Sequence, residues 1–471
     1  MKHLRSAIVI LGLFSFTSCA TYYQKNIEFQ RYFTSGDMEK AYKYLEKDEK
    51  SAKGKAKVLY YMNKGVVAHM LGDYSLSNTY LLVADRLVED YQKNYGLEIL
   101  SFVTNPLLTE YQAEDFESVM IHYYLALNYI QLGNYEDAIV ECKRINNRLN
   151  YINDNRKQRI TYRQDAFALN LMGMIFEADG QVNDAFIAYR NAYETYQGDY
   201  AKDYGLSAPE QLKQDLLRTA YLNGFMDELR QYEQAFGRKY LPETQKDSGS
   251  VVFLWNNGLG PVKAELALTF TVIPGTGGAV TFKNDELGWV FPFPAYNLGA
   301  EDKQNLGNLR MVRIVLPKFV ERIPLFEKGI VKAGGKTYTL EKVQDVNAIA
   351  FQNLEDRMLR ELGEALLRVA LKQAAAEAVR KKNEGLGAAL NVIGALSEQA
   401  DTRNWQTLPH DIYYSRINLP PGEHQLQLET SGNGSTDVHY LNVKVLKGKT
   451  TFISFSSLEA ISQPAQGFWQ P

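Results

Sequence analysis

The spacing of apolar residues changes along this chain of 471 residues. Up to about residue 240, apolar positions recur every three to four residues, which is typical of amphipathic helices. After the polar segment 242–250, apolar and polar positions alternate, which is typical of strands. The helical period returns from about 346 to 382 and gives way to alternation again after 401. The pattern predicts an α+β protein whose helical first half precedes a strand-rich second half with one long helix.

A pattern of small, glycine and aromatic residues repeats within the helical half. In each copy one helix ends at a glycine, and a second helix carries a small residue at a fixed place, which lets the two helices approach closely. This pattern resembles the tetratricopeptide repeat, which implies a solenoid whose concave wall binds peptides or proteins. The alternative is an irregular helical domain with no groove in use. The turn glycines are Gly36, Gly72, Gly133 and Gly180, and a further helical pair is predicted from Ser207 to Phe236, with a capping box at Ser207–Glu210.

Tyrosine is abundant in the helical half. The chain has 31 tyrosines, and this residue is enriched at protein interfaces. We therefore select Tyr123 and Tyr124 as candidate partner-binding residues. The alternative is that most tyrosines pack between helices with their hydroxyls at the rim. Cys142 stands at a repeat position normally filled by a bulky residue, which favours a buried thiol over a reactive one.

The second half contains several predicted strands and one long helix. The strands are expected at 251–255, 263–273, 289–294 (a proline-marked edge), 309–316 and 336–340. A helix is predicted from Val346 to Lys382. A short glycine- and alanine-rich helix from Leu386 to Leu396 is expected to fold back on it. The alternative for this short helix is a segment that dips into the membrane. The terminal region predicts a strand at 419–428 and a hairpin formed by 443–445 and 450–455.

Two resemblances cover this second half. The Leu-Pro-Pro-Gly start of the strand at 419–428 and the strands after it resemble small β-sandwich modules of the PEGA type. Residues 240–460 resemble a group of bacterial lipoproteins with an Asp-x-Arg-x-Trp segment, here Asp401, Arg403 and Trp405. Genes of that group often accompany those of lipoprotein activators of peptidoglycan-synthesising penicillin-binding proteins. The three residues either clasp a ligand or partner, or form an Asp–Arg pair beside a core tryptophan; we favour the second.

The first twenty residues have the pattern of a lipoprotein signal. Lys2 and Arg5 precede an apolar run, Ala7–Phe16, that is too short to span a bilayer. Small residues and Cys19 follow, which resembles a bacterial signal in which Cys19 becomes the acylated first residue, although Phe16 replaces the usual leucine. The alternative is a secretory peptide with an incidental cysteine. By resemblance to sorting rules, Ala20 favours the outer membrane, and the lack of an acidic cluster favours its periplasmic face.

Composition and motifs narrow the function classes. Removing residues 1–18 takes away Lys2 and Arg5 and leaves 50 basic and 55 acidic residues, so no nucleic-acid partner is expected. Apart from Cys19 the only cysteine is Cys142, which cannot form an internal disulfide. The histidines lack zinc-site spacing, and no nucleophile elbow or phosphate-binding loop is present. We therefore expect no catalytic residues, no metal site and no cofactor.

These observations define an expected organisation and function. We expect a signal peptide (1–18), a repeat domain (19–240), a β-rich domain (241–345), a long helix hairpin (346–400) and a PEGA-like β-module (401–471) packed with 241–345. The expected function is a non-enzymatic outer-membrane lipoprotein, anchored through Cys19, that scaffolds envelope proteins in cell-wall synthesis, outer-membrane assembly or secretion. The alternative is an envelope enzyme or ligand-binding lipoprotein with a cleft near Asp401, Arg403 and Trp405.

Overall fold

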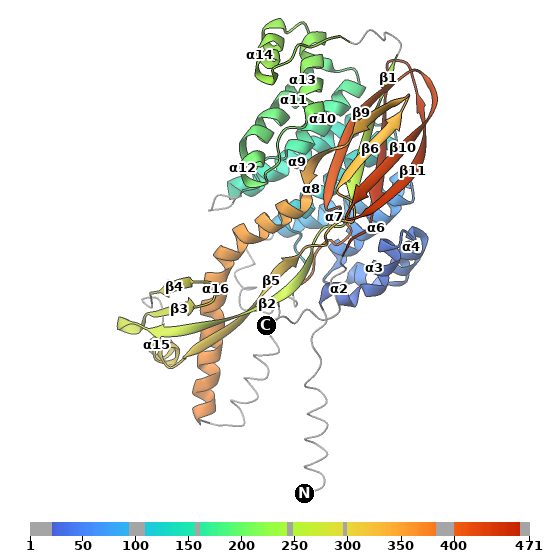
Figure 1. The fold of residues 1–471 in the computed structure, drawn as a ribbon. Helices are drawn as coiled ribbons and strands as arrows, with labels where there is room; N and C mark the ends of the chain where they lie inside the picture. The colour runs from blue at the N-terminus through green and yellow to red at the C-terminus, as the bar shows by residue number, and fades with distance from the viewer. Residues whose placement is uncertain are drawn as a thin grey trace.

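The computed structural model describes residues 21–93, 109–155, 161–242, 248–294, 299–382 and 400–461. Helices fill its first half and strands dominate its second half, so the predicted α+β class is confirmed (Figure 1). The signal sequence, Cys19 and the short helix predicted at 386–396 lie outside the described residues. Among the helices that are described, none is both long and apolar enough to cross a membrane.

Within the described residues, the first half contains five antiparallel helix pairs. Each predicted turn glycine ends the first helix of a pair with a positive φ, between 76° at Gly36 and 83° at Gly180, and Gly224 does the same in the fifth pair. The predicted positions of the turns are therefore confirmed. The pairs are α3 (Ile27–Thr34) with α4 (Met38–Lys47), α6 (Lys57–Met70) with α7 (Tyr74–Lys93), α8 (Asp115–Gln131) with α9 (Tyr135–Asn155), α10 (Ala166–Ala178) with α11 (Val182–Thr195), and α13 (Glu210–Leu222) with α14 (Met226–Phe236). Short helical segments are α2 (Tyr22–Lys25), α5 (Glu49–Lys53), η4 (Tyr196–Tyr200) and α12 (Ala201–Asp203).

The start of α13 corrects one prediction. The expected capping box at Ser207–Glu210 does not form, because Pro209 takes the N-cap position without a side-chain bond to the helix. Instead the carboxylate of Glu341, far along the chain, accepts the backbone N–H groups of Glu210 and Gln211 at 2.8 Å each. A carboxylate at this position also complements the helix dipole. The last helix pair is thus capped by the β-rich half.

The strands within the described residues form three four-stranded sheets. The central sheet has the order β12-β1-β9-β8, the outer sheet β11-β10-β6-β7, and the arm sheet β4-β3-β2-β5. Their strands are β1 (Gly249–Asn257), β2 (Val262–Pro274), β3 (Val280–Asn284), β4 (Trp289–Phe293), β5 (Met311–Val320), β6 (Lys328–Ala333), β7 (Lys336–Thr339), β8 (Glu341–Asp345), β9 (Asp411–Leu419), β10 (Gly422–Gly432), β11 (Ser435–Val445) and β12 (Thr450–Ser457), with a short helix η5 (Thr276–Gly278) between β2 and β3.

The pairing of the last two strands differs from the predicted hairpin. β11 pairs with β10 in the outer sheet, whereas β12 crosses to the central sheet and runs parallel to β1. β1 therefore lies between two strands from the end of the chain, β12 and β9. Residues 401–461 do not form a separate sandwich beside 241–345, because their strands share hydrogen bonds with strands of both the central and the outer sheet.

Both faces of the central sheet are buried. On one face, Val251, Phe253 and Trp255 of β1 pack against the outer sheet and form the sandwich core. On the other face, Val252 and Leu254 join the core of the helical half. This explains why β1 has a continuous apolar sequence rather than an alternating one.

The arm sheet projects away from this double layer (Figure 1). One of its faces is covered by α15 (Ala300–Gly307) and by the far half of α16 (Val346–Lys382), through residues such as Leu362 and Leu366. The near half of α16 contributes Ile349 and Leu354 to the helical core. At 1.5 Å per residue, a helix of 37 residues extends for about 55 Å. One continuous helix therefore links the arm to the body.

Candidate functional site

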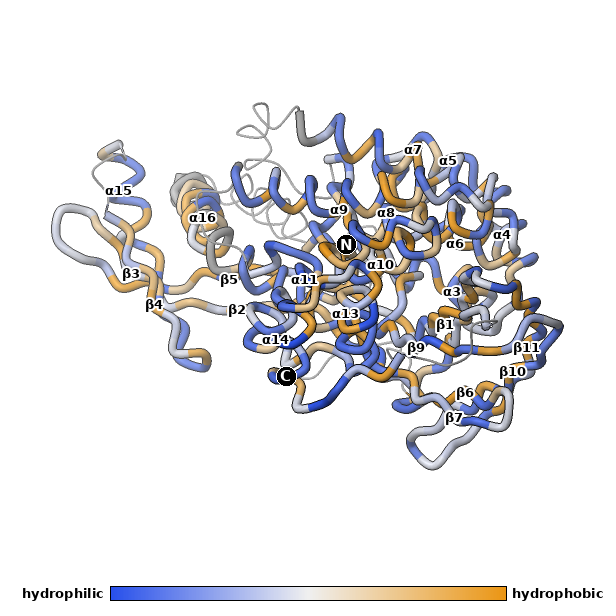
Figure 2. Tube along the Cα trace, turned by 90° about the horizontal axis from the view of Figure 1, so that it is seen from above, coloured by the Kyte–Doolittle hydropathy of each residue, from blue (hydrophilic) through white to orange (hydrophobic). Residues whose placement is uncertain are grey.

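The inner face of the helical half, formed by the first helix of each pair, is covered by the chain's own second half. Figure 2 shows the helices following an arc around one side of β1 and β9. The Tyr123 hydroxyl on α8 donates to Asn256 Oδ1 at 2.8 Å, and Tyr196 donates to the carbonyl oxygen of Val343 at 2.7 Å. Glu177 of α10 is ion-paired with Arg416 of β9 at 2.9 Å. The wall that the repeat resemblance assigns to partners is therefore occupied by the central sheet.

The aromatic residues selected from the sequence lie inside this contact. Tyr123, Tyr124 and Trp405 are 2%, 4% and 1% exposed, and the rings of Tyr124 and Trp405 are 6.0 Å apart. The Trp405 backbone N–H donates to Glu117 Oε1 at 2.6 Å, and its indole N–H donates to Thr407 Oγ1 at 2.8 Å. Trp405 thus lies in the core, and the two tyrosines contact residues of the same chain rather than an open surface.

Asp401 and Arg403 form the ion pair that the second interpretation expects. Arg403 Nε and Nη2 donate to the two carboxylate oxygens of Asp401 at 2.8 and 2.7 Å. Arg403 Nη1 also donates to the carbonyl oxygens of Lys55 and Thr109, at 3.3 and 3.2 Å. These bonds hold the segment after α16 against the loops that precede α6 and α8.

A buried ionic cluster joins the helical half to the root of the arm. Glu114, at the start of α8, is ion-paired with Lys263 of β2 and, at 2.8 Å, with Arg357 of α16. Burial alone would raise the pKa of Glu114, but Arg357 and Lys263 outweigh it and lower the pKa to about 2. Burial raises the pKa of the neighbouring Glu117 to about 7. The cluster fixes the position of the arm relative to the helices.

Among the described residues, one group has the donor types of a metal site. Atoms of Asp345, His410 and Asp411 lie within 4.8 Å of one another. However, the ammonium group of Lys342 lies 2.8 Å from Asp411 Oδ1 and 3.4 Å from Asp345 Oδ2. Lys342 already supplies the positive charge that a cation would bring. The group is best described as an ion-paired junction of β8, β9 and α16.

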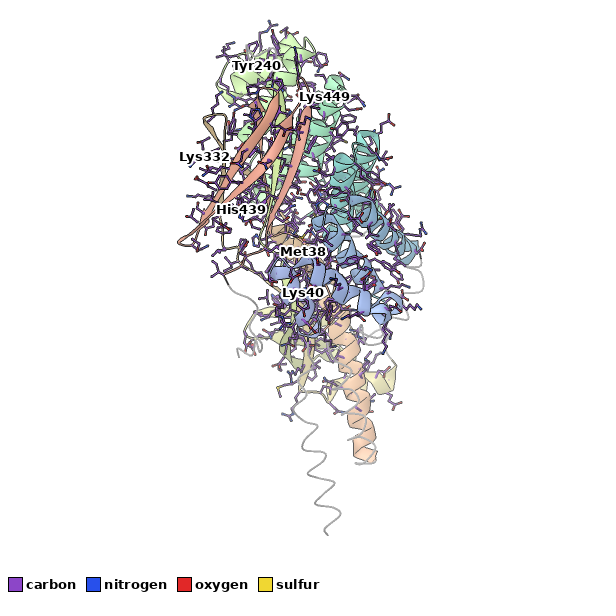
Figure 3. The ribbon with its side chains drawn as sticks, turned by 90° about the vertical axis from the view of Figure 1, so that its right-hand side faces the viewer. Met38, Lys40, Tyr240, Lys332, His439 and Lys449 are labelled. Carbon is purple, nitrogen blue, oxygen red and sulfur yellow. The ribbon has the colours of Figure 1, made fainter. Side chains whose placement is uncertain are left out.

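A cleft opens where the central sheet ends and the last helix pair continues; we call it the seam cleft. Its volume is about 660 Å³, within the range of ligand-binding pockets. Figure 3 labels two of its residues, Tyr240 and Lys449, which lie at the same end of the molecule and far from Met38 and Lys40 of the first helix pair. Its wall consists of Glu177, Gln214, Leu217, Arg218, Tyr221, Leu222, Arg238, Lys239, Tyr240, Leu241, Pro242, Ser248, Gly249, Ser250, Arg416, Asn418, Gly448, Lys449 and Thr450.

The floor of the seam cleft is a buried network of two arginines and two carboxylates. Arg218 Nε and Nη2 donate to Glu177 at 2.9 and 2.8 Å, and Nη2 also lies 2.6 Å from Asp215. Arg416 Nη2 donates to Glu177 at 2.9 Å and to the Tyr189 hydroxyl at 3.0 Å. Burial would raise the pKa of Glu177, but Arg218 and Arg416 hold it well below its usual value.

The rim of the seam cleft combines apolar and cationic side chains. Leu222 and Leu241 are 56% and 80% exposed, and the rings of Tyr221 and Tyr240 are 5.3 Å apart. Lys449 reaches the rim from the turn between β11 and β12. Sequence reasoning missed this cleft because its wall comes from six separate stretches of the chain. The one local signal was the polar linker at 242–250, parts of which border the cleft.

Comparisons with known proteins give only distant likenesses. No protein-family model matches the chain, and no curated protein matches it. Among solved structures it is similar to BtubC from P. vanneervenii, with 15% identity, a TM-score of 0.31, and coverage of 47% of this chain and 83% of that chain. It is also similar to a kinesin light chain with nearly identical TPR-like repeats from Podosopora anserina, with 13% identity, a TM-score of 0.28, and coverage of 44% and 90%. The paired-helix architecture itself follows from the turn glycines and helix packing of this chain.

Proposed function

We propose that this protein is a membrane-anchored scaffold that binds other proteins of the bacterial cell envelope. The observation that carries the proposal is the seam cleft, an open and amphipathic site beside an inner face that the central sheet fills. Its wall belongs to both halves of the chain, which share one continuous core through the central sheet. A rigid frame with a preformed site binds a partner without the cost of ordering a flexible segment.

The proposed anchor fits the position of the first described helix. Tyr22 N, at the start of α2, donates to Thr402 Oγ1 at 2.9 Å, which fixes the beginning of the body near the root of the arm. Cys19 lies two residues before Thr21, a span of at most about 7 Å when extended. An acylated Cys19 would hold the body directly at the membrane surface, and several acyl chains make such an anchor effectively permanent. By the resemblance of its signal, we place the protein on the periplasmic face of the outer membrane.

The anchor is tested by replacing Cys19 with alanine. We expect Cys19→Ala to lose labelling by a clickable fatty acid and to move from the membrane fraction to the soluble fraction. The matched control is Cys142→Ala, which should keep both the label and the membrane location. A Cys19→Ala protein that stays in the membrane fraction would contradict the anchor.

The scaffold role is tested by purification of the tagged protein from mild detergent after crosslinking in cells. We expect envelope proteins to co-purify in fixed ratio to the scaffold. Recovery of the protein alone, together with activity on an envelope glycan or peptide, would contradict the proposal. The alternative cleft at Asp401, Arg403 and Trp405 has no support, because these side chains bond within the chain and do not line the seam cleft.

A further inference from the structure

We propose that the seam cleft binds an acidic peptide segment, with leucine-like side chains beside its carboxylates, from the partner of the scaffold. This inference rests on the proposed function and specifies the chemistry of the partner. It is carried by the charges on the rim of the cleft, by the exposed apolar residues beside them and by the volume of the cleft.

The floor of the cleft is balanced in charge. Glu177 is the only carboxylate residue on the described wall, whereas Arg218, Arg238, Lys239, Arg416 and Lys449 are cationic. Its carboxylate already accepts bonds from Arg218, Arg416 and Tyr189. Arg218 and Arg416 are in turn paired with Glu177 and with the buried Asp215. A charged group of a ligand would therefore pair with the rim of the cleft rather than with its floor.

The rim adds positive charge where solvent can reach it. Arg238 and Lys239 are ion-paired with Glu210 and Glu233, at 3.3 and 2.7 Å. Lys449 is exposed, lines the cleft and has no ion-pair partner among the described residues. An incoming carboxylate can therefore pair with Lys449 without displacing a bond that the folded chain already makes. Charge of this kind also steers an oppositely charged partner toward its site.

Apolar side chains between the charges select against a purely ionic ligand. Leu222 and Leu241 are among the most exposed large apolar residues described, and both line the same cleft as Tyr221. Covering them with an apolar side chain gains about 25 cal/mol for each Å² removed from water. A volume of about 660 Å³ accommodates a short segment rather than a folded domain. An acidic peptide with interspersed leucines satisfies all three features.

The test compares two fluorescein-labelled ten-residue peptides by fluorescence anisotropy. One alternates Leu with Glu and Asp, and the other replaces each acid by Gln or Asn. The protein is the full chain with Cys19 replaced by alanine. We expect saturable binding of the acidic peptide, weakened about tenfold or more in the neutral peptide and weakened further by added salt. Equal binding of the two peptides, or no binding of the acidic one at millimolar concentration, would overturn the inference.

Two exposed substitutions locate the binding. Lys449→Glu should weaken binding of the acidic peptide by about fivefold or more, because it reverses one rim charge. Leu222→Asp should weaken it as well, through loss of apolar contact and added repulsion. The matched control is Lys332→Glu on the outer sheet, whose ammonium is paired with Glu429 and lies outside the cleft. Far-UV circular dichroism and melting temperature verify that each variant is folded.

The outcome also separates this inference from the proposed function. If Lys449→Glu and Lys332→Glu bind the acidic peptide equally, the peptide does not occupy the seam cleft and the inference fails. If envelope proteins still co-purify with Lys449→Glu at wild-type levels, the scaffold proposal stands and its partner docks elsewhere. Loss of co-purification in Lys449→Glu but not in Lys332→Glu supports both.

Discussion

Replacing Trp405 with alanine tests whether the helical and β-rich halves unfold as one unit. Trp405 is 1% exposed and packs on Tyr124, and its backbone N–H bonds to Glu117 of α8. The substitution keeps that backbone bond but removes the indole ring and its bond to Thr407. The remaining cavity would lie directly between α8 and the segment before the central sheet.

The size of the effect follows from the buried area. A buried aromatic side chain removes roughly 150–250 Å² from water, which at about 25 cal/mol per Å² is worth about 4–6 kcal/mol. Alanine recovers part of this, and measured Trp→Ala changes in cores cost about 3–5 kcal/mol. We therefore expect Trp405→Ala to lower the free energy of unfolding by about 4 kcal/mol. Trp405→Phe keeps most of the ring contact and should cost about half as much.

The assay is urea unfolding of the protein with Cys19 replaced by alanine, followed by circular dichroism at 222 nm. One cooperative transition is expected in the parent and in each variant, since the two halves share a core. The control is Tyr440→Ala, at a side chain that is 62% exposed, which should change stability by less than about 0.5 kcal/mol. A loss below about 1 kcal/mol for Trp405→Ala, or two separate transitions in the parent, would refute the shared core.

Three further predictions concern buried positions. Burial raises the pKa of Glu117 from 4.5 to about 7, so the free energy of unfolding falls as the pH rises between these two values. Glu117→Gln should remove up to roughly 3 kcal/mol of that fall. Identical pH dependence of urea unfolding in the two proteins would contradict this. A Cβ at Gly173 would lie 2.5 Å from the Tyr189 ring, so Gly173→Ala should cost about 1–3 kcal/mol in thermal unfolding, and an unchanged melting temperature would show that α10 and α11 are farther apart. Cys142 is fully buried, and burial raises the pKa of its thiol. Maleimide should therefore label Cys142 only in denaturant. Rapid labelling of the native protein would place this thiol at the surface.

Local features of the fold were predictable from the sequence because they depend on near neighbours. The turn glycines are examples, because a left-handed residue between two helices requires glycine in most contexts. The long helix is another: α16 begins at the predicted residue, Val346, and is helical throughout its described length, to Lys382. The continuous apolar run of β1 also indicated a buried strand.

Long-range pairing was not predictable in the same way. The turn at Lys447–Lys449 suggested a hairpin, and Gly448 does adopt a positive φ of 64° there. Nevertheless β12 leaves its neighbour and pairs with β1, about 200 residues earlier, because its alternate residues complete two different cores. Phe452 packs into the helical core near Tyr135, and Phe455 packs against the sandwich core. The strand with which β12 pairs therefore depends on both cores at once, and the local sequence pattern carries no information about them.

The covered inner face did leave a signal in the sequence. The sequence of α10, Ala166–Ala178, is apolar apart from Asn170 and Glu177. In the structure α10 is buried almost throughout from Ala166 to Phe176, as is every residue of α8 from Phe116 to Asn128. A repeat helix that lines an open groove needs a polar side, whereas a helix that is apolar around its circumference is enclosed by protein. The nearly apolar circumference of α10 therefore predicts that the concave wall is filled there, a step beyond the repeat resemblance alone.

Filling the wall changes what the helix repeats can do in this chain. A partner that entered the inner face would have to displace a sheet whose two faces are both buried, and separate Arg416 from Glu177 in a dry environment. Breaking a buried ion pair by removing one partner typically costs about 3–5 kcal/mol, before any apolar area is exposed. α13, the first helix of the last pair, differs because the central sheet ends beside it and leaves the seam cleft open. Binding at the seam cleft leaves the frame intact, so the repeats act as a support for the site rather than as its groove.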